Sequence, residues 1–509
     1  MKKLQRLEAI SCLSQKDKNW EHKDIFRTLS NEDFWIIAYE KIKGNKGGLT
    51  PGSTPETLGG MSLERLHQLK NDVYSEKYKF AAVKRTFIPR PDGRNRPLGL
   101  PTANDKIVQE VMRMILEAIY EPVFCNLSFG FRTGRGCHTA LEHIEQKFRW
   151  VDWVVEVDIQ QAYPTIDHEV LVTILEKRID DPRFIRLIRK LLKCGVLEDD
   201  RKIYSDTGVP QGSIVSPILA NIYYHELDEY VYKLAHSYLT PPDKITKRKS
   251  TEYKALEYKI AKITKKMKDI PESSIEYKHY VKEFKSIRKE RLMTNSLKDL
   301  VIRIEYARYA DDWIIGVAGD QKLALQFKEK VGDFLLNTLK QVIHPVKTKV
   351  TNLRNGNVHF LGYDIFLPMN RPISTYKGRG VRTIRRGNPR LRFDVPVARL
   401  EQRYVDRKYL KRTNKGIRPI SRASYACLED HVIVAHYRSI WLGIKNYYSG
   451  CTNRGRLQYF HYLLHMSCAM TLGHRHRMSC TKILKKHGKN LSIQVPNTEK
   501  IVSFPYKTT

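Results

Sequence analysis

Apolar residues that alternate with polar ones, or run on without interruption, indicate β-strands in several parts of the chain. Residues 86–88 and 153–157 have this pattern. Residues 301–317 contain two apolar runs separated by the tetrapeptide Tyr309-Ala310-Asp311-Asp312. Because so short a segment joins the two runs, it predicts a β-hairpin with two adjacent carboxylates at its tip. We expect residues 300–366 as a whole to form strands.

Other segments carry apolar residues at the spacing of three and four that is typical of an α-helix. Residues 107–119 place Ile107, Val111 and Ile115 on one such face, and residues 428–490 repeat the pattern with Ile433, Tyr437 and others. These segments predict helices. The aromatic residues of the second segment are expected mainly in a core, with base stacking as the alternative.

Residues 241–299 interrupt the mixed pattern around them. Two apolar stripes, Tyr253 to Met267 and Tyr280 to Ile287, flank a break at residues 269–274, and lysines dominate the remaining positions. The pattern predicts an antiparallel helical hairpin with one apolar seam and basic outer faces. A solvated charged linker is the alternative. We expect this segment to be an insertion that adds RNA contacts.

The organisation that follows from these patterns has four parts. We expect an N-terminal extension over residues 1–75, an α/β unit over 76–366 that carries the insertion 241–299, a basic and then helical domain over 367–490, and a tail over 491–509. A chain of 509 residues has room for two or more such domains.

The net charge of the chain indicates the kind of partner that it binds. Lys and Arg number 90 against 55 Asp and Glu, a net charge of +35. Such an excess indicates a large polyanionic partner, for which nucleic acid and a membrane surface compete. The sequence has no uninterrupted apolar run near the ~18 residues of a membrane span, so we expect no membrane insertion. The basic N-terminus lacks the apolar core of a secretory signal.

The eight cysteines are scattered, and none forms a Cys-x-x-Cys pair. This spacing predicts neither a zinc ribbon nor a Cys-rich nuclease module, and it favours a reducing compartment with mostly buried thiols. We therefore expect no endonuclease activity.

The candidate chemistry starts with carboxylates at strand ends. Asp311 and Asp312 together are costly to place at a hydrophobic hairpin tip unless a cation lies there, although an ordinary Asp-Asp turn remains the alternative. Asp158 follows the strand at 153–157 and is, by itself, an equally ordinary strand-end residue. Carboxylates at the ends of two neighbouring β elements are able to hold two Mg²⁺ ions about 4 Å apart for phosphoryl transfer.

A third segment is the loop Gly208-Val209-Pro210-Gln211-Gly212-Ser213, which leads into a helical pattern at Ser216. It places the amide of Gln211 where it is able to meet a nucleotide. An ordinary helix-entry loop is the alternative.

These segments, in this order, resemble the palm of a reverse transcriptase. The segments around Arg96-Pro97-Leu98-Gly99 and Ser128-Phe129-Gly130-Phe131 resemble the fingers motifs of group II intron-encoded reverse transcriptases, and Phe360-Leu361-Gly362-Tyr363 is similar to the end of that palm. The resemblance runs from about residue 30 to 490. Residues 48–53 and 158–164 look most like the mitochondrial-like branch of the family. The fold class implied is α+β: a right-hand polymerase with fingers and palm, followed by an α-helical thumb or maturase domain.

The resemblance also implies roles for individual residues. Asp158, Asp311 and Asp312 match the catalytic carboxylates, and the Ile159 carbonyl would complete a metal shell for two Mg²⁺ ions. Tyr163 would exclude a ribose 2′-hydroxyl and so favour dNTP over NTP, and Gln211 would contact the incoming nucleotide. The cations expected at the nucleotide are Lys84, Arg90 and Lys347, for each of which a solvated surface charge is the alternative.

The C-terminal part resembles the family's maturase region, notably Gly443-Ile444-Lys445-Asn446-Tyr447-Tyr448 and Leu463 to Ala469. A helical module rich in cations is suited to binding RNA duplexes by shape and phosphate contacts. The residues expected to face RNA are His474, Arg475, His476, Arg477, Lys482, Lys485 and Lys486.

The resemblance thus implies an RNA-directed DNA polymerase that is also an intron maturase, acting on group II intron RNA, an RNA template with a DNA primer, dNTPs and possibly target DNA. The expected compartment is the mitochondrial matrix or a bacterial cytoplasm. An RNA-binding splicing factor with a silent polymerase is the main alternative. A retron or defence reverse transcriptase is disfavoured by residues 418–489, and a viral RNA replicase by Tyr163 and the Gln211 loop.

Overall fold

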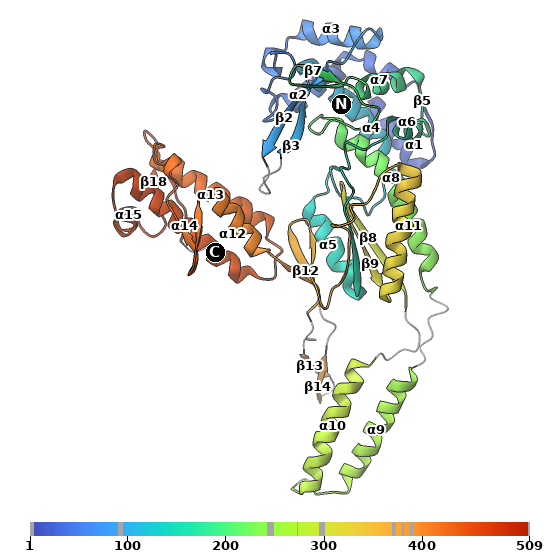
Figure 1. Cartoon of the computed structure of the whole chain (residues 1–509), viewed down its shortest axis with the longest axis vertical. Helices are drawn as coiled ribbons and strands as arrows, with labels where there is room; N and C mark the ends of the chain where they lie inside the picture. Colours follow the sequence, from blue (N-terminus) through green and yellow to red (C-terminus); the bar gives the residue numbers. More distant parts are fainter. Residues whose placement is uncertain are drawn as a thin grey trace.

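The computed structural model describes residues 5–89, 95–241, 249–271, 273–294, 301–368, 373–378, 381–386 and 390–506. Figure 1 shows a group of helices around β2 and β3 at one end, a sheet flanked by helices in the middle, and a mainly helical C-terminal part to one side. This arrangement confirms the expected α+β class, with the fingers, palm and thumb of a right-hand polymerase.

The palm is built on a four-stranded antiparallel sheet with the order β10-β4-β9-β8. Its strands are β4 (Trp153–Val157), β8 (Arg303–Tyr309), β9 (Asp312–Ala318) and β10 (Lys349–Asn352). The register pairs Val157 with Trp313 and Tyr309 with Asp312. The β8–β9 hairpin predicted from the sequence is therefore confirmed, and β4 lies beside it.

Helices cover both faces of this sheet. Helices α8 (Ser216–Tyr238) and α11 (Gln321–Leu339) pack on one face, and α5 (Cys137–Lys147) packs on the other. The expectation of strands throughout residues 300–366 is wrong at α11. This segment carries Leu323, Phe327 and Val331 at intervals of four residues, all buried, and Asp320 caps its first turn.

The fingers contain six helices among the described residues: α1 (Gln5–Lys16), α2 (Glu32–Lys43), α3 (Leu63–Tyr74), α4 (Ala103–Tyr120), α6 (His168–Glu176) and α7 (Pro182–Leu192). Helix α4, predicted from its apolar face, is buried almost throughout and contacts α1 and α2. A single hydrophobic core therefore continues from the N-terminal helices into the palm, across residue 75.

A second sheet completes the fingers in the order β3-β2-β6-β7. Its members are β2 (Val83–Pro89), β3 (Asn95–Leu100), β6 (Val196–Glu198) and β7 (Arg201–Ile203), and a short parallel pair joins β1 (His22–Lys23) to β5 (Ile179–Asp180). The β2–β3 hairpin reaches from the fingers toward the palm (Figure 1).

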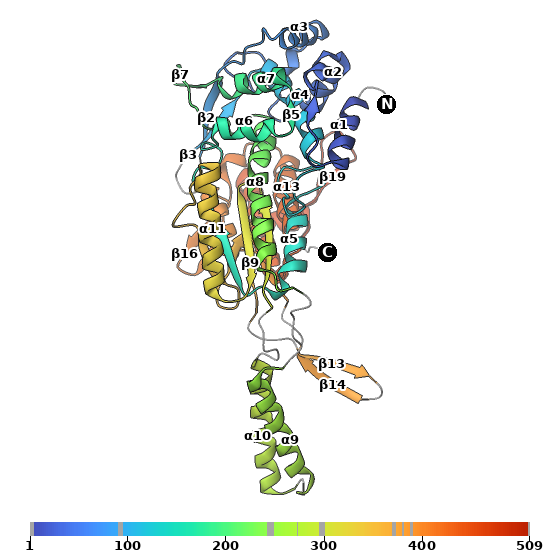
Figure 2. The same cartoon turned by 90° about the vertical axis from the view of Figure 1, so that its right-hand side faces the viewer.

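The insertion forms the predicted helical hairpin, α9 (Thr251–Lys268) and α10 (Ile275–Met293). The two helices are antiparallel, since Arg291 lies over the ring of Tyr253 at one end and Lys266 lies over the ring of Tyr280 at the other. Leu256 and Ile263 are buried in the seam. Figure 2 shows the hairpin extending from the end of the palm opposite the fingers.

The C-terminal part follows a three-stranded sheet of β11 (Val358–Phe360), β12 (Tyr363–Phe366) and β15 (Arg392–Asp394). Its helices are α12 (Val397–Asp406), α13 (Asp430–Tyr447), α14 (Arg454–His476) and α15 (Cys480–His487), and its remaining strands pair as the hairpins β13–β14 (Ile373–Gly378, Val381–Arg386), β16–β17 (Leu410–Thr413, Gly416–Pro419) and β18–β19 (Ile493–Gln494, Ile501–Val502).

The helices expected over residues 428–490 are confirmed. The tail folds back onto them, because Phe504 is fully buried against the rings of His461 and His465. Among the described residues, no helix has both the length and the apolar character needed to cross a membrane.

Candidate active site

The β8–β9 turn holds Asp311 and Asp312 in a constrained conformation. Only Ala310 and Asp311 separate the paired residues Tyr309 and Asp312, and Ala310 has a φ of +58°. A residue with a side chain adopts this left-handed conformation at a cost, so the surroundings must favour it. Two contacts do so: Arg308 donates a hydrogen bond to the Ala310 carbonyl (2.9 Å), and the backbone at Gly130 lies directly against Ala310.

Gly130 is required by this close approach. A Cβ atom at residue 130 would collide with the backbone nitrogen of Ala310, which is unable to move aside without distorting the turn. The segment that carries Gly130 is held to β8 by hydrogen bonds from the Phe129 amide to the Arg308 carbonyl and from the Arg308 amide to the Leu127 carbonyl, both 2.9 Å. The sequence Ser128-Phe129-Gly130 therefore supports the turn from behind.

Arg308 is the centre of a buried polar network under the turn. Its guanidinium is fully buried and forms an ion pair with Asp228 of α8 at 2.7 Å. It also donates to Asn221 Oδ1 (3.0 Å) and to Ser128 Oγ (2.8 Å). The planar guanidinium has five N–H donors, which match this set of acceptors. A lysine ammonium is unable to reach all of them.

Asp158 joins the two hairpin carboxylates through strand register. Val157, the last residue of β4, is paired with Trp313, so Asp158, which follows it, lies beside the start of β9 at Asp312. The Asp158 carboxylate forms an ion pair with Lys347 at 2.9 Å. The structure thus brings together Asp158, Asp311, Asp312 and Lys347, four residues proposed from the sequence.

The carboxylates perturb one another. Burial and the nearby Asp158 raise the pKa of Asp311, while Arg96 and Arg308 oppose the rise. Burial, Asp311 and Asp158 raise the pKa of Asp312 to about 6, against the effect of Lys347. The Asp312 residue is nonetheless exposed to water on its outer side. Mutual repulsion of this kind is relieved by a bound cation.

The donor set suits a hard divalent cation only in part. The oxygens of three carboxylates are ligands that Mg²⁺ prefers. The hydrogen bonds that join residue 159 to residue 343 use the Asp158 carbonyl and the Gln160 amide, so the Ile159 carbonyl is not engaged by this bridge. Within the described ranges, no three acidic, histidine or cysteine side chains are already arranged as a metal-binding group. Phosphate oxygens of a nucleotide would have to supply the remaining ligands, as is common for Mg²⁺.

Tyr163 and the Gln211 loop are fastened together beside the carboxylates. The Val209 amide donates to the Tyr163 carbonyl (3.0 Å), and the Gly99 amide donates to the Gln211 carbonyl (2.5 Å). Tyr163 is almost fully buried. Burial and the nearby Asp311 raise the pKa of its phenol, so it stays neutral.

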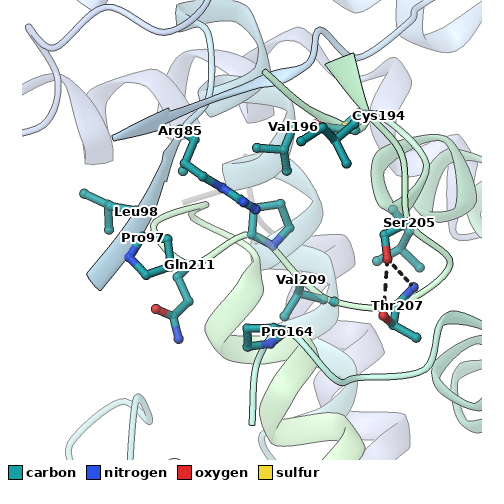
Figure 3. A pocket seen from close by; sticks show the side chains of 16 residues that line it. Arg85, Pro97, Leu98, Pro164, Cys194, Val196, Ser205, Thr207, Val209 and Gln211 are labelled. Carbon is teal, nitrogen blue, oxygen red and sulfur yellow. Dashed lines mark hydrogen bonds between the residues drawn. The ribbon is translucent and has the colours of Figure 1, made fainter. Parts of the chain in front are cut away.

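A cavity of about 210 Å³ opens behind this loop. Figure 3 shows Arg85 reaching into it, with Pro97 and Gln211 on one side and Ser205 and Thr207 on the other. Arg85 is held by an ion pair with Glu198 at 2.7 Å.

The cations expected to reach the nucleotide from the fingers are Lys84 and Arg90. Lys84 is exposed on β2, and the register puts it on the same face as Arg96, but four residues away along the strand, roughly 13 Å. Arg90 lies outside the described residues. Among the described residues of the fingers, Arg96 reaches the site: its Nε donates to Gln211 Oε1 (3.2 Å), and its charge opposes the rise in the pKa of Asp311.

Arg96 and Arg308 are therefore residues of the site to which the sequence reasoning gave no role. Each stood inside a segment already noted, Arg96 before Pro97 and Arg308 before Tyr309. The feature of the sequence that could have identified them is a cation close to the carboxylate motif or to a loop motif.

The residues expected to face RNA separate into two groups. Arg475 forms an ion pair with Asp430 of α13 (3.0 Å), and His476 forms a hydrogen bond with the same carboxylate (2.7 Å). His474 and Arg477 are exposed near the end of α14. On α15, the exposed cations are Lys482, Lys485 and Lys486.

Comparison with known families matches both halves of the chain. Residues 88–240 match the family described as reverse transcriptase (RNA-dependent DNA polymerase), and residues 388–508 match the type II intron maturase family. The first match ends where the α9–α10 insertion begins.

Individual relatives cover nearly the whole chain. The group II intron-encoded protein LtrA of Lactococcus lactis is 34% identical over 483 residues, which cover 94% of this chain and 79% of the relative. An uncharacterized 91 kDa protein in the cob intron of Schizosaccharomyces pombe is 35% identical over 96% of this chain, and a putative COX1/OXI3 intron 1 protein of Saccharomyces cerevisiae is 34% identical over 95%. The chain spans 59% and 57% of the length of these two fungal relatives.

This chain belongs to the group II intron-encoded proteins and carries the reverse transcriptase and intron maturase domains of that family.

Proposed function

We propose that this protein is an RNA-directed DNA polymerase that copies intron RNA and a maturase that binds its group II intron RNA to promote splicing and mobility. The observation that carries the polymerase proposal is the convergence of Asp158, Asp311 and Asp312 at the ends of the two central strands of the palm sheet, next to Tyr163 and Gln211. Carboxylates concentrated in this way are able to hold the metal ions that phosphoryl transfer requires.

In the proposed reaction, the 3′-oxygen of a DNA primer bonds to the α-phosphorus of a dNTP, and the bond to the β-phosphate oxygen breaks to release pyrophosphate. Two Mg²⁺ ions, when held by Asp158, Asp311, Asp312 and the Ile159 carbonyl, would activate the 3′-hydroxyl and neutralise the leaving pyrophosphate. The protein's own contribution is positioning and charge.

Several side chains would orient the nucleotide. Tyr163, buried and neutral, would contact C2′ of the sugar and leave no space for a ribose hydroxyl. Gln211, fixed by Arg96, would contact the nucleotide from the side of the fingers. The phosphates would be bound by Lys84, Arg90 and Lys347. Lys347 would leave its ion pair with Asp158 when metal binds that carboxylate, and would then pair with the nucleotide.

The C-terminal domain would bind intron RNA, with His474, Arg477, Lys482, Lys485 and Lys486 as direct contacts. Arg475 and His476 would act indirectly, because Asp430 already engages them. The RNA supplies the splicing chemistry, and the cationic surface offsets phosphate repulsion as RNA helices pack. Target DNA is a further proposed partner. The mitochondrial matrix and a bacterial cytoplasm are the proposed compartments.

Primer extension tests the proposal directly. Purified protein with poly(rA)/oligo(dT), dTTP and Mg²⁺ is expected to extend the primer, and Asp311→Ala to lower the rate at least 10²-fold. Asp333→Ala, which removes an exposed carboxylate from α11, is the matched control and should extend normally. Wild-type protein that stimulates intron splicing without extending the primer would identify a splicing factor instead.

Sugar selection has its own measurement. Tyr163→Ala is expected to raise rNTP incorporation relative to dNTP in the same assay. Unchanged selectivity would remove this role from Tyr163.

A further inference from the structure

A groove of about 1080 Å³ lies between the β16–β17 hairpin and one face of α14, in the C-terminal domain. Its floor is a stripe of α14 residues at helical spacing: Tyr459, Tyr462, Met466, Met470 and Gly473. Tyr459 and Tyr462 are 52% and 41% exposed, whereas their neighbours Phe460 and Leu463 are buried in the core. This face of α14 therefore presents aromatic rings to solvent that the domain's own packing does not use.

Basic residues form the walls of the groove. Lys411, Lys415 and Arg418 come from the β16–β17 hairpin, and His474 and Arg477 come from the end of α14. Neither the hairpin, nor α14, nor α15 contains an aspartate or glutamate. Among the described residues, no ion pair engages Lys411, Lys415, Arg418 or Arg477.

The strand register makes this charge costly in the isolated protein. Lys411 and Arg418 are directly paired across the two strands, so their side chains leave the same face of the hairpin. Like charges in this position destabilise a hairpin unless an anion lies between them. The negative end of the α14 dipole partly accounts for Arg477, but not for the hairpin cations.

The aromatic floor distinguishes between nucleic-acid ligands. The rings of Tyr459 and Tyr462 are tilted by only 26° and their centroids are 6.5 Å apart, close to twice the ~3.4 Å spacing of stacked bases. Bases in a duplex are covered by their neighbours, so exposed rings beside cations favour a strand whose bases are free to stack. Methionines beside the rings adapt to bases of different size.

We infer that this groove binds an unpaired polynucleotide strand, with bases stacked on Tyr459 and Tyr462 and phosphates held by Lys411, Arg418 and Arg477. The inference rests on the proposed maturase function, because a single-stranded segment of intron RNA is the expected source. It adds a site at which the C-terminal domain reads unpaired nucleotides, in addition to duplex contacts made by shape.

Labelled hexamers test the inference on the full chain. The dissociation constant of hexauridylate is expected to rise roughly 10-fold for Tyr459→Ala and again for Tyr462→Ala. Tyr459→Phe and Tyr462→Phe should bind normally, because they keep the rings. Lys411→Gln with Arg418→Gln should reduce the dependence of log affinity on log salt by about 1.4. Tyr232→Ala, an exposed tyrosine of α8, is the control and should change nothing.

Three comparisons make the result decisive. Tighter binding of the RNA hexamer than of hexadeoxyuridylate assigns the groove to intron RNA, and the reverse assigns it to single-stranded DNA; either supports an unpaired strand. Two results for the variant with both Tyr459→Ala and Tyr462→Ala would overturn the inference. One is an unchanged affinity for the hexamer, and the other is a loss of affinity for a blunt RNA hairpin as large as the loss for the hexamer. Primer extension, expected to persist in all these variants, separates this outcome from failure of the polymerase proposal.

Discussion

Arg308 stabilises the site without touching solvent. It binds Asp228 and Asn221 of α8 and Ser128 of the loop before α5, and it donates to the carbonyl of Ala310, the residue with positive φ. Arg308 lies two residues before Ala310 in the chain. The orientation of the Asp311 carboxylate, which follows Ala310, therefore depends on this buried cation. We regard Arg308 as a positioning residue.

Replacing Arg308 tests this role. Arg308→Met should lower the free energy of unfolding by about 3–5 kcal/mol, because the buried Asp228 carboxylate keeps the hydrogen bond from Tyr306 but loses its ion-pair partner. Arg308→Met with Asp228→Leu should recover much of that stability in chemical denaturation, yet remain slow in primer extension because Ala310 has lost its donor. Arg303→Met, on the exposed end of the same strand, should be normal in both. Full polymerase activity in the double variant would contradict the positioning role.

Asp312 provides a pH-dependent test at the same scale. Its pKa of about 6 in the folded protein lies above the ordinary aspartate value of 3.8, so its ionisation opposes folding increasingly from about pH 4 to pH 6 and fully above. Without metal, Asp312→Asn should therefore raise Tm more at pH 7.5 than at pH 4.5. The rise should be small, about 1 °C, since water reaches the side chain.

Mg²⁺ supplies the control for this measurement. It should stabilise wild-type protein at pH 7.5 and remove most of the advantage of Asp312→Asn, because the cation offsets the same repulsion. An equal Tm difference at both pH values would show that Asp312 ionisation does not oppose folding.

At the scale of elements, α10 separates its charges into two stripes. Lys278, Lys282, Lys285 and Lys289 recur at intervals of four and three, while Glu276, Glu283 and Glu290 recur at intervals of seven on another side of the helix. All seven are exposed. The hairpin lies far from the β8–β9 turn in both views (Figures 1 and 2), so we expect its lysines to contribute to RNA binding and not to polymerisation.

Neutralising one stripe at a time separates these functions. Changing the four lysines to glutamine should weaken binding to structured intron RNA and lower the salt slope by about 3. Changing the three glutamates to glutamine should leave binding equal or tighter. Both variants should extend oligo(dT) normally, and a defect in extension for the lysine variant alone would place the hairpin in the polymerase instead.

At the scale of the whole molecule, a second hydrophobic core joins the α5 side of the palm to the C-terminal domain. Tyr447 at the end of α13 connects the two: its hydroxyl donates to the Leu361 carbonyl (2.8 Å), and its carbonyl accepts from the Tyr363 hydroxyl (2.5 Å) and contacts the His138 ring nitrogen (2.8 Å). Leu361 and Gly362 have φ values of +46° and +73°. This turn fixes how the C-terminal domain sits beside the site.

Tyr447→Ala should therefore loosen the two domains. We expect about 2 kcal/mol of lost stability and products several-fold shorter per binding event, because the duplex leaving the site is held from one side only. Addition of the first nucleotide should stay close to the wild-type rate, and Tyr447→Phe should show a weaker form of the same defect. An equal loss of first-nucleotide addition and product length would place Tyr447 in the chemistry.

The sequence was sufficient wherever local pattern decides structure. Alternation in residues 301–317 predicted the β8–β9 hairpin, and the stripe from Tyr253 to Met267 predicted the insertion. Helix α11 was missed because its Leu323, Phe327 and Val331 lie within a strand-rich segment whose general pattern was extended over it.

The sequence by itself determined the chemistry that is present: Asp311 and Asp312 at a turn, Asp158 after a strand, and cations in excess. Only the tertiary structure decided which of these residues meet. It brought Asp158 beside Asp312 through the β4–β9 register, put Arg96 rather than Lys84 at Gln211, and paired Arg475 and His476 with Asp430. Local pattern reports which face of an element is apolar, whereas the partner of a polar side chain depends on contacts between residues far apart in the chain.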